Sequence, residues 1–220
     1  MRKILCYLLF SLIAFSATSQ QLYLEMGRVN TKFDYINSDG SSLQNVTGKS
    51  NIFMALGYNH FVPKTRVSIF AGLAYNKYGA NSSDELLNNY FEWDLSYIAP
   101  HVGLGYEFFK PLEMLPEFRG FTVTIKGAIA TEFMLKGSQM VNNLVYDLND
   151  LEPYKSPVFY YRCGVQVNYY LSKNLVCFAQ LTAAKSARIE ELLYGKLINH
   201  EELRFKTQSF GFGIAYCIRK

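Results

Sequence analysis

The stretch Phe121–Lys136, FTVTIKGAIATEFMLK, decides how the rest of the sequence is interpreted. Its apolar side chains, such as Val123 and Ile125, follow a two-residue period, and the opposite phase carries Lys126 and Glu132. Successive side chains of a β-strand point to opposite faces, so this alternation predicts a strand with one oily and one polar face.

The same alternation recurs along the chain and predicts an all-β fold. The connections between segments alternate in length: His60–Thr65 and Leu171–Asn174 are short, and Phe109–Gly120 is intermediate. The long connections are Ile36–Ser50, Gly79–Tyr90, Gly137–Pro157 and Lys185–Arg204. Short turns at one end and long loops at the other are typical of an antiparallel up-and-down membrane barrel with about eight strands. The predicted strands are Leu22–Tyr35, Asn51–Asn59, Arg66–Tyr78, Phe91–Phe108, Phe121–Lys136, Val158–Tyr170, Leu175–Ala184 and Phe205–Ile218.

Composition excludes several other classes of protein. The chain has 220 residues, with 17 Tyr and 17 Phe, and its mean hydropathy is close to zero. Past residue 20 no apolar run reaches the ~18 residues that a membrane-spanning helix needs. The formal net charge is +4 and the basic residues are dispersed. We therefore expect no nucleic-acid partner, because binding the phosphate backbone needs clustered Lys and Arg.

The N-terminus is typical of an export signal. A short basic start and an apolar stretch over Ile4–Phe15 precede the small residues Ala17 and Ser19. This order of basic, apolar and small residues predicts a signal peptide over residues 1–19 that is cleaved after Ser19. The exported part, residues 20–220, would then form a single barrel domain.

The two faces of the strands distinguish a membrane barrel from a soluble one. One face of nearly every segment is apolar, while the other carries charged groups among Gly and Ala. Turning a Lys or Arg toward the centre of a bilayer costs about 2–4 kcal/mol, so the polar face is predicted to line the lumen. Eight strands leave an interior just wide enough for side chains, which favours a salt-bridged plug over an open pore. The predicted lumen charge network comprises Arg28, Lys126, Glu132 and Arg162.

Tyrosines recur on the apolar phase, near the ends of strands that lead into short turns. Aromatic side chains are enriched where a membrane meets water, so we predict a periplasmic aromatic girdle. Its predicted members are Tyr58, Tyr75, Tyr106, Tyr169 and Tyr216.

Four short motifs carry a resemblance to a known class of protein. They are MGRV at 26–29, AGLAY at 71–75, GLGY at 103–106 and GFGIAY at 211–216. With these motifs the chain resembles the small outer-membrane β-barrel proteins of the Bacteroidetes, within the broader class of outer-membrane protein A-like and porin-like barrels. The resemblance implies a location in the outer membrane, contact with its lipid, and assembly by the barrel-assembly machinery. It implies no reaction.

No catalytic, cofactor or metal motif is recognisable, and we expect no enzyme. His101 is the one candidate base, but no Ser-His-Asp spacing accompanies it, and a hydrogen-bonded lumen histidine is the favoured interpretation. The acidic stretch from Asp147 to Glu152 lacks the pattern of a calcium loop and is interpreted as solvated.

The sequence favours a structural role, or a scaffold whose surface loops bind something outside the cell. Three alternatives remain open: a small channel or transporter for ions or amphiphiles, an outer-membrane enzyme acting on lipid or peptide, and a soluble ligand-carrying barrel. The ligand and the surface partner are not identified by any motif.

Overall fold

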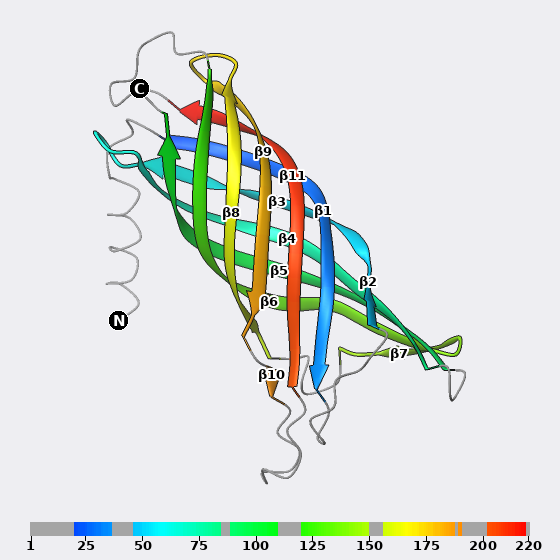
Figure 1. Ribbon diagram of the computed structural model, residues 1–220. Coiled ribbons are helices and arrows are strands. Elements are labelled where there is room, and N and C mark those ends of the chain that lie inside the picture. The colour runs from blue at the N-terminus through cyan, green and yellow to red at the C-terminus, as the bar shows by residue number, and fades with distance from the viewer. Residues whose placement is uncertain are drawn as a thin grey trace.

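Eight long antiparallel strands follow one another around a closed barrel in the computed structural model (Figure 1), which describes residues 20–36, 46–84, 89–109, 120–149, 156–187, 189–190 and 202–218. β1 pairs with β11 along its whole length, from Gln20 opposite Ile218 to Ile36 opposite Glu202, and this pairing closes the sheet. The predicted fold is confirmed. The strands are β1 (Gln20–Ile36), β3 (Ser50–Phe61), β4 (Val67–Asp84), β5 (Asn89–Phe108), β6 (Phe121–Val141), β8 (Val158–Tyr170), β9 (Leu175–Ser186) and β11 (Glu202–Ile218).

The two ends of the barrel differ. We call the end with the connections 62–66 and 171–174, where Gln20 and Ile218 also lie, the turn end, and the opposite end the loop end. Figure 1 shows the turn end at the upper left and the loop end at the lower right. The expected contrast between the two ends holds only in part. The turn-end connection 109–120 has 12 residues, whereas the loop-end connection 85–88 has four because β4 and β5 extend into the predicted loop Gly79–Tyr90.

The loop end contains more β-structure than the sequence predicts. β4 continues to Asp84, and β6 continues to Val141 before a tight turn leads into β7 (Leu144–Asp147). Asn142 and Asn143 both have positive φ, 47° and 70°, as a two-residue hairpin turn requires. These segments were predicted as loops because polar residues interrupt their alternation. The short strands β2 (Val46–Gly48) and β10 (Ile189–Glu190) also lie at this end, paired with β4 and β11.

A belt of large apolar side chains surrounds the outside of the barrel. Leu56 and Ile129 are 60% and 57% exposed. On β8 the belt runs from Phe159 to Tyr169, which corresponds to a height of about 25 Å for strands tilted by about 40°. One exposed belt residue from each strand illustrates its continuity: Leu24, Leu56, Leu73, Leu104, Ile129, Val165, Leu181 and Phe212.

Inside the barrel, polarity changes along the axis. Toward the loop end the interior is an apolar cluster that includes Phe33, Tyr97, Tyr160 and Phe205. On β1 and β11 the outside at this level is polar, with Asn30, Lys32, Lys206 and Gln208 exposed, so these two strands are built there like those of a soluble barrel. Nearer the turn end, charged and amide side chains share the interior with a smaller apolar cluster that includes Val176 and Phe178, and many large apolar side chains lie outside. The apolar face therefore passes from outside to inside along a single strand.

Candidate functional site

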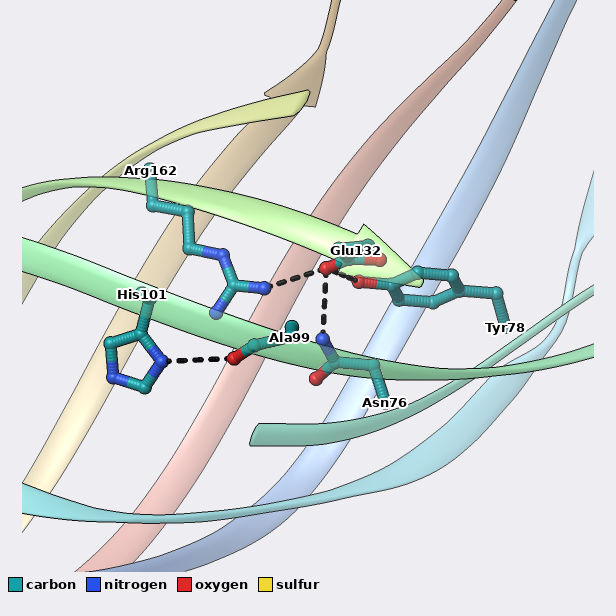
Figure 2. A network of polar contacts seen from close by, with 6 residues as sticks. All are labelled: Asn76, Tyr78, Ala99, His101, Glu132 and Arg162. Carbon is teal, nitrogen blue, oxygen red and sulfur yellow. Dashed lines mark hydrogen bonds and ion pairs between the residues drawn. The ribbon is translucent and has the colours of Figure 1, made fainter. Parts of the chain in front are cut away.

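A buried carboxylate on β6 is the centre of the first polar cluster in the lumen (Figure 2). Glu132 is fully buried, and its Oε1 accepts hydrogen bonds from Arg162 Nη2 at 2.6 Å and Tyr78 OH at 2.7 Å. Asn76 Nδ2 donates a third hydrogen bond to the same oxygen, at 2.9 Å. These donors reach Glu132 from β8 and β4. A buried charge is tolerated only with such partners, so the cluster ties three strands together.

Lys126 occupies the middle of the lumen. Its ammonium donates hydrogen bonds to Gln180 Oε1 at 3.0 Å and to the side chain of Gln166. Aromatic faces attract a cation within about 6 Å, so the rings around this ammonium replace part of its lost hydration. The centroids of the Phe70, Tyr23 and Phe178 rings lie 5.0, 5.6 and 5.8 Å from Nζ.

Tyr23 and His101 face each other across two glycines. The register places Tyr23 opposite Gly57, Gly57 opposite Gly72, and Gly72 opposite His101, in one row over four strands. Tyr23 OH lies 2.8 Å from His101 Nε2, and His101 Nδ1 lies 3.3 Å from the Ala99 carbonyl oxygen. A ring nitrogen must be protonated to bond a carbonyl, so Nδ1 donates and Nε2 accepts from the tyrosine.

A second buried carboxylate, Glu107, lies near the turn end. Its Oε1 accepts hydrogen bonds from Tyr170 OH at 2.8 Å and Thr122 Oγ1 at 2.5 Å. Asn168 Nδ2 donates to the hydroxyls of Thr122 and Thr124, at 3.1 and 2.9 Å. Side-chain hydrogen bonds therefore join β5, β6 and β8 inside the barrel at this level.

The lumen retains a small cavity between these clusters. Its volume is about 70 Å³, and Glu25, Lys126, Arg162 and His101 are among the residues that line it. At ~15 Å³ per water this space holds about five water molecules. Sites for drug-sized ligands measure about 300–1,000 Å³, so the cavity fits water or a small ion and nothing larger.

The structure turns Lys126, Glu132 and Arg162 inward and brings Glu132 and Arg162 into direct contact. Arg28 is a correction to the predicted network. Its side chain is exposed on the outer wall, between the inward-facing Gly27 and the buried Val29. The prediction placed Arg28 inside because it assumed that the apolar phase faces outward along the whole strand. Beyond Met26 the apolar phase of β1 faces inward.

Four of the five predicted girdle tyrosines lie near the turn end. Tyr58, Tyr106, Tyr169 and Tyr216 are each within three residues of a strand end there. Tyr75 is a correction, because it is on the outer wall near mid-strand, opposite Met54 and Ile98. The prediction placed Tyr75 correctly in an apolar phase, but it placed the residue too close to the turn end. The role of the other tyrosines at a membrane interface stays a prediction.

Several lumen residues were not predicted as site residues. Glu25 alternates with Leu24 and Met26, and Glu107 follows Tyr106, so both fall on the inward phase. The alternation rule applied to every charged residue would have found them. Tyr23 was missed because an aromatic residue was expected to face outward.

Two features are absent from the residues that the structure describes. No group of three or more His, Cys, Asp or Glu side chains among them lies close enough to hold a metal ion. No helix in these ranges is long and apolar enough to cross a bilayer. Asp150, Glu152 and the predicted signal peptide, residues 1–19, lie outside the described residues.

Comparison with known proteins supports the fold alone. No family model matches the chain, and no curated protein matches it. The crystal structure of the outer membrane protein OprG from Pseudomonas aeruginosa is similar, with a TM-score of 0.51 and 11% identity over 93% of this chain and 99% of OprG. The outer membrane protease OmpT from Escherichia coli gives a TM-score of 0.48 and 9% identity, over 93% of this chain and 98% of OmpT. The likeness to OprG shows a shared barrel fold.

Proposed function

We propose that this chain is an integral protein of a bacterial outer membrane whose plugged barrel holds and presents its loop-end surface. The observation that carries the proposal is the direction of the side chains: Ile125 and Val165 are 50% and 46% exposed, while Glu132 is buried. Leaving a large apolar side chain in water forfeits about 1.5–3 kcal/mol relative to burying it. A continuous belt of such residues is explained when hydrocarbon covers it.

The filled lumen supports a structural or scaffold role. The Glu132–Arg162 pair and the Lys126 and Glu107 hydrogen bonds join neighbouring strands inside the barrel at successive levels, and the Lys126 ammonium also faces the Tyr23 ring of β1 on the other side of the lumen. With about 70 Å³ of cavity between them, the lumen offers little room for a permeating solute. The rigid wall would then serve to hold the loop-end residues in place, where binding functions concentrate.

The experiment has two steps. The chain is expressed with its N-terminal segment, and we expect it in the outer-membrane fraction, with a shift in electrophoretic migration after boiling. The purified protein is then added to planar bilayers, where we expect no stepwise conductance. Recovery of the chain in water without detergent would overturn the membrane location. A constant ohmic current per inserted molecule would overturn the plug.

A narrow ion path is a second candidate, favoured by one observation. Side chains of both charge signs, Glu25, Lys126 and Arg162, meet at the small cavity. Rings of charge of this kind set ion selectivity in channels. If the lumen conducts, Lys126→Glu should shift the reversal potential in a salt gradient toward cation selectivity. If neither the parent protein nor this variant conducts ions, the lumen is not an ion path.

We also propose that the protein is not an enzyme and that His101 has a packing role. Both of its ring nitrogens have partners, the Tyr23 hydroxyl and the Ala99 carbonyl. His101→Ala is therefore expected to lower barrel stability without abolishing a reaction. Loss of a lipid- or peptide-cleaving activity from this variant, in membranes with an unchanged amount of barrel, would contradict the proposal.

We also propose that the protein originates from the Bacteroidetes and is exported by a cleaved N-terminal signal. The four barrel motifs and the N-terminal pattern support a Bacteroidetes origin, a signal peptide over residues 1–19, and insertion by the barrel-assembly machinery. N-terminal sequencing of the membrane form is expected to begin at Gln20. A start at Met1 in the membrane form would contradict cleavage.

A further inference from the structure

Three lysines stand side by side on the outer wall at the loop end. The register places Lys32 on β1 directly opposite Lys206 on β11, and Lys206 directly opposite Lys185 on β9. All three side chains are exposed, and each lies next to a buried residue of its own strand, which fixes their outward direction. We call Lys32, Lys185 and Lys206 the lysine row.

Adjacent lysines in register are unfavourable unless something neutralises them. Side chains directly opposite each other have Cβ atoms about 4.5–5.5 Å apart, and like charges at that spacing destabilise the pair. Asp34 forms an ion pair with Lys206, so among the described residues one carboxylate pairs with three ammonium groups. The row therefore carries a surplus of positive charge that an external anion would neutralise.

The position of the row identifies the class of anion. On β9, Lys185 follows the exposed residue Ala183 by two positions. On β11, Lys206 precedes the exposed residue Phe210 by four positions. These spacings are about 7–13 Å along a strand, or about 5–10 Å in height after a tilt of about 40°. The headgroup layer of a bilayer is about 5–8 Å thick on each side, so the ammonium groups reach the depth of lipid phosphates.

The wall below and beside the row is suited to an amphiphile. Phe210 and Leu181 are exposed belt residues in register with each other, on the same two strands as Lys206 and Lys185. Tyr161, 67% exposed, lies directly opposite Lys185 on β8. One molecule could therefore place its acyl chains on the belt and its anionic group on the row.

We propose that the lysine row binds the phosphate groups of a membrane lipid, whose acyl chains lie on the belt at Phe210 and Leu181. This inference rests on the proposed membrane location. Lysine binds phosphate as a point charge, and several lysines can share the oxygens of one or two phosphates. The contact of belt and row favours a lipid over a soluble polyanion, which would need no apolar surface.

The test uses the full barrel in nanodiscs of neutral phosphatidylcholine doped with synthetic bisphosphorylated lipid A or with its dephosphorylated form. Bound lipid is counted by native mass spectrometry. The row variant combines Lys32→Gln, Lys185→Gln and Lys206→Gln. The control variant combines Lys64→Gln, Lys77→Gln and Lys173→Gln, which removes the same charge from β4 and from the turn-end connections 62–66 and 171–174.

We expect the row variant to bind the bisphosphorylated lipid at least ~10-fold more weakly, since each lysine contributes to attraction at the surface. The control variant should stay close to the parent protein. Asp34→Asn removes the carboxylate that pairs with Lys206 and should strengthen binding, a gain that misfolding cannot imitate. Migration before and after boiling confirms that each variant is folded.

Several outcomes would overturn the inference. They are equal binding by the parent protein and the row variant, equal binding of the dephosphorylated lipid, and lipid-independent binding of heparin through the row. The last result would assign the row to a soluble polyanion. If the parent protein does not enter nanodiscs, the proposed membrane location is wrong. If the parent protein enters nanodiscs and the row variant binds the bisphosphorylated lipid equally well, only the inference about the lysine row is wrong.

Discussion

Tyr23 and His101 are hydrogen-bonded across the lumen, 2.8 Å apart, although β3 and β4 separate their strands. The contact is possible because Gly57 and Gly72 lie between them in the same cross-strand row. A Cβ on either glycine would come within 2.6 Å of the tyrosine hydroxyl. The Tyr23 side chain therefore packs directly over the two glycines of β3 and β4, and its hydrogen bond joins β1 to β5.

A larger residue in place of Gly57 should destabilise the barrel. A Cβ on Gly57 would lie 2.4 Å from the Ala71 carbonyl oxygen and 2.5 Å from Tyr23 OH. We expect Gly57→Ala to cost about 1–3 kcal/mol of unfolding free energy, as overpacking does. Urea unfolding in lipid vesicles measures it. Gly127, with nothing within 4 Å of an added Cβ, is the matched control. Equal stability of the two variants would contradict this packing argument.

The Glu132–Arg162 pair gives a second prediction. Arg162→Leu leaves a fully buried carboxylate without its counter-ion and should cost about 3–5 kcal/mol. Combining it with Glu132→Leu removes both charges, so the double variant should be more stable than Arg162→Leu alone. The free energies come from the same urea titrations.

An exposed ion pair serves as the comparison. Lys49 pairs with Glu92 on the outer wall, where both side chains are partly exposed. Lys49→Gln should cost at most about 1 kcal/mol. If Arg162→Leu proves no more destabilising than Lys49→Gln, the Glu132 carboxylate is not held in the buried, charged form that the cluster implies.

Much of the fold is predictable from sequence because the two-residue period is a local property. The apolar and charged residues of Phe121–Lys136 have the predicted facing at Ile125, Lys126 and Glu132. A small inward residue makes room for a larger neighbour at Gly213, where an added Cβ would lie 2.2 Å from Phe178 Cζ. Alternation and side-chain size together determine which wall a residue faces.

The misplaced residues depend on height along the barrel, which the period does not encode. Arg28 was assigned inward because the surrounding medium was assumed to be the same at every level. Beyond Met26 the exposed face of β1 carries Arg28, Asn30 and Lys32, and Val29 and Phe33 become core residues. Tyr75 faces outward as predicted, but it lies near the middle of β4 and not at its turn end. The partners of Glu132, which come from β4 and β8, depend on register and could not be read from one strand.

A charged residue in the belt tests which wall faces hydrocarbon. Val165 lies midway between Phe159 and Tyr169 on β8 and is 46% exposed. Val165→Arg should cost about 2–4 kcal/mol in a lipid bilayer, whereas Asn30→Arg on the outer wall beyond the belt should cost about 0–1 kcal/mol. Folding titrations in vesicles compare the two. Equal costs would mean that Val165 does not lie at the depth of the hydrocarbon.

The free cysteines allow the depth of the belt to be measured directly. Cys163 is exposed, two residues from Val165 on the same face of β8, and Cys217 is buried. With Cys177→Ser and Cys217→Ala in place, a nitroxide on Cys163 should collide frequently with molecular oxygen, which concentrates in hydrocarbon, and rarely with a water-soluble nickel chelate. A nitroxide at Asn30→Cys should show the opposite preference, because that side chain lies beyond the belt. If the nitroxide on Cys163 collides mainly with the nickel chelate, this face of β8 lies in water. The proposal of a membrane barrel would then lose its basis.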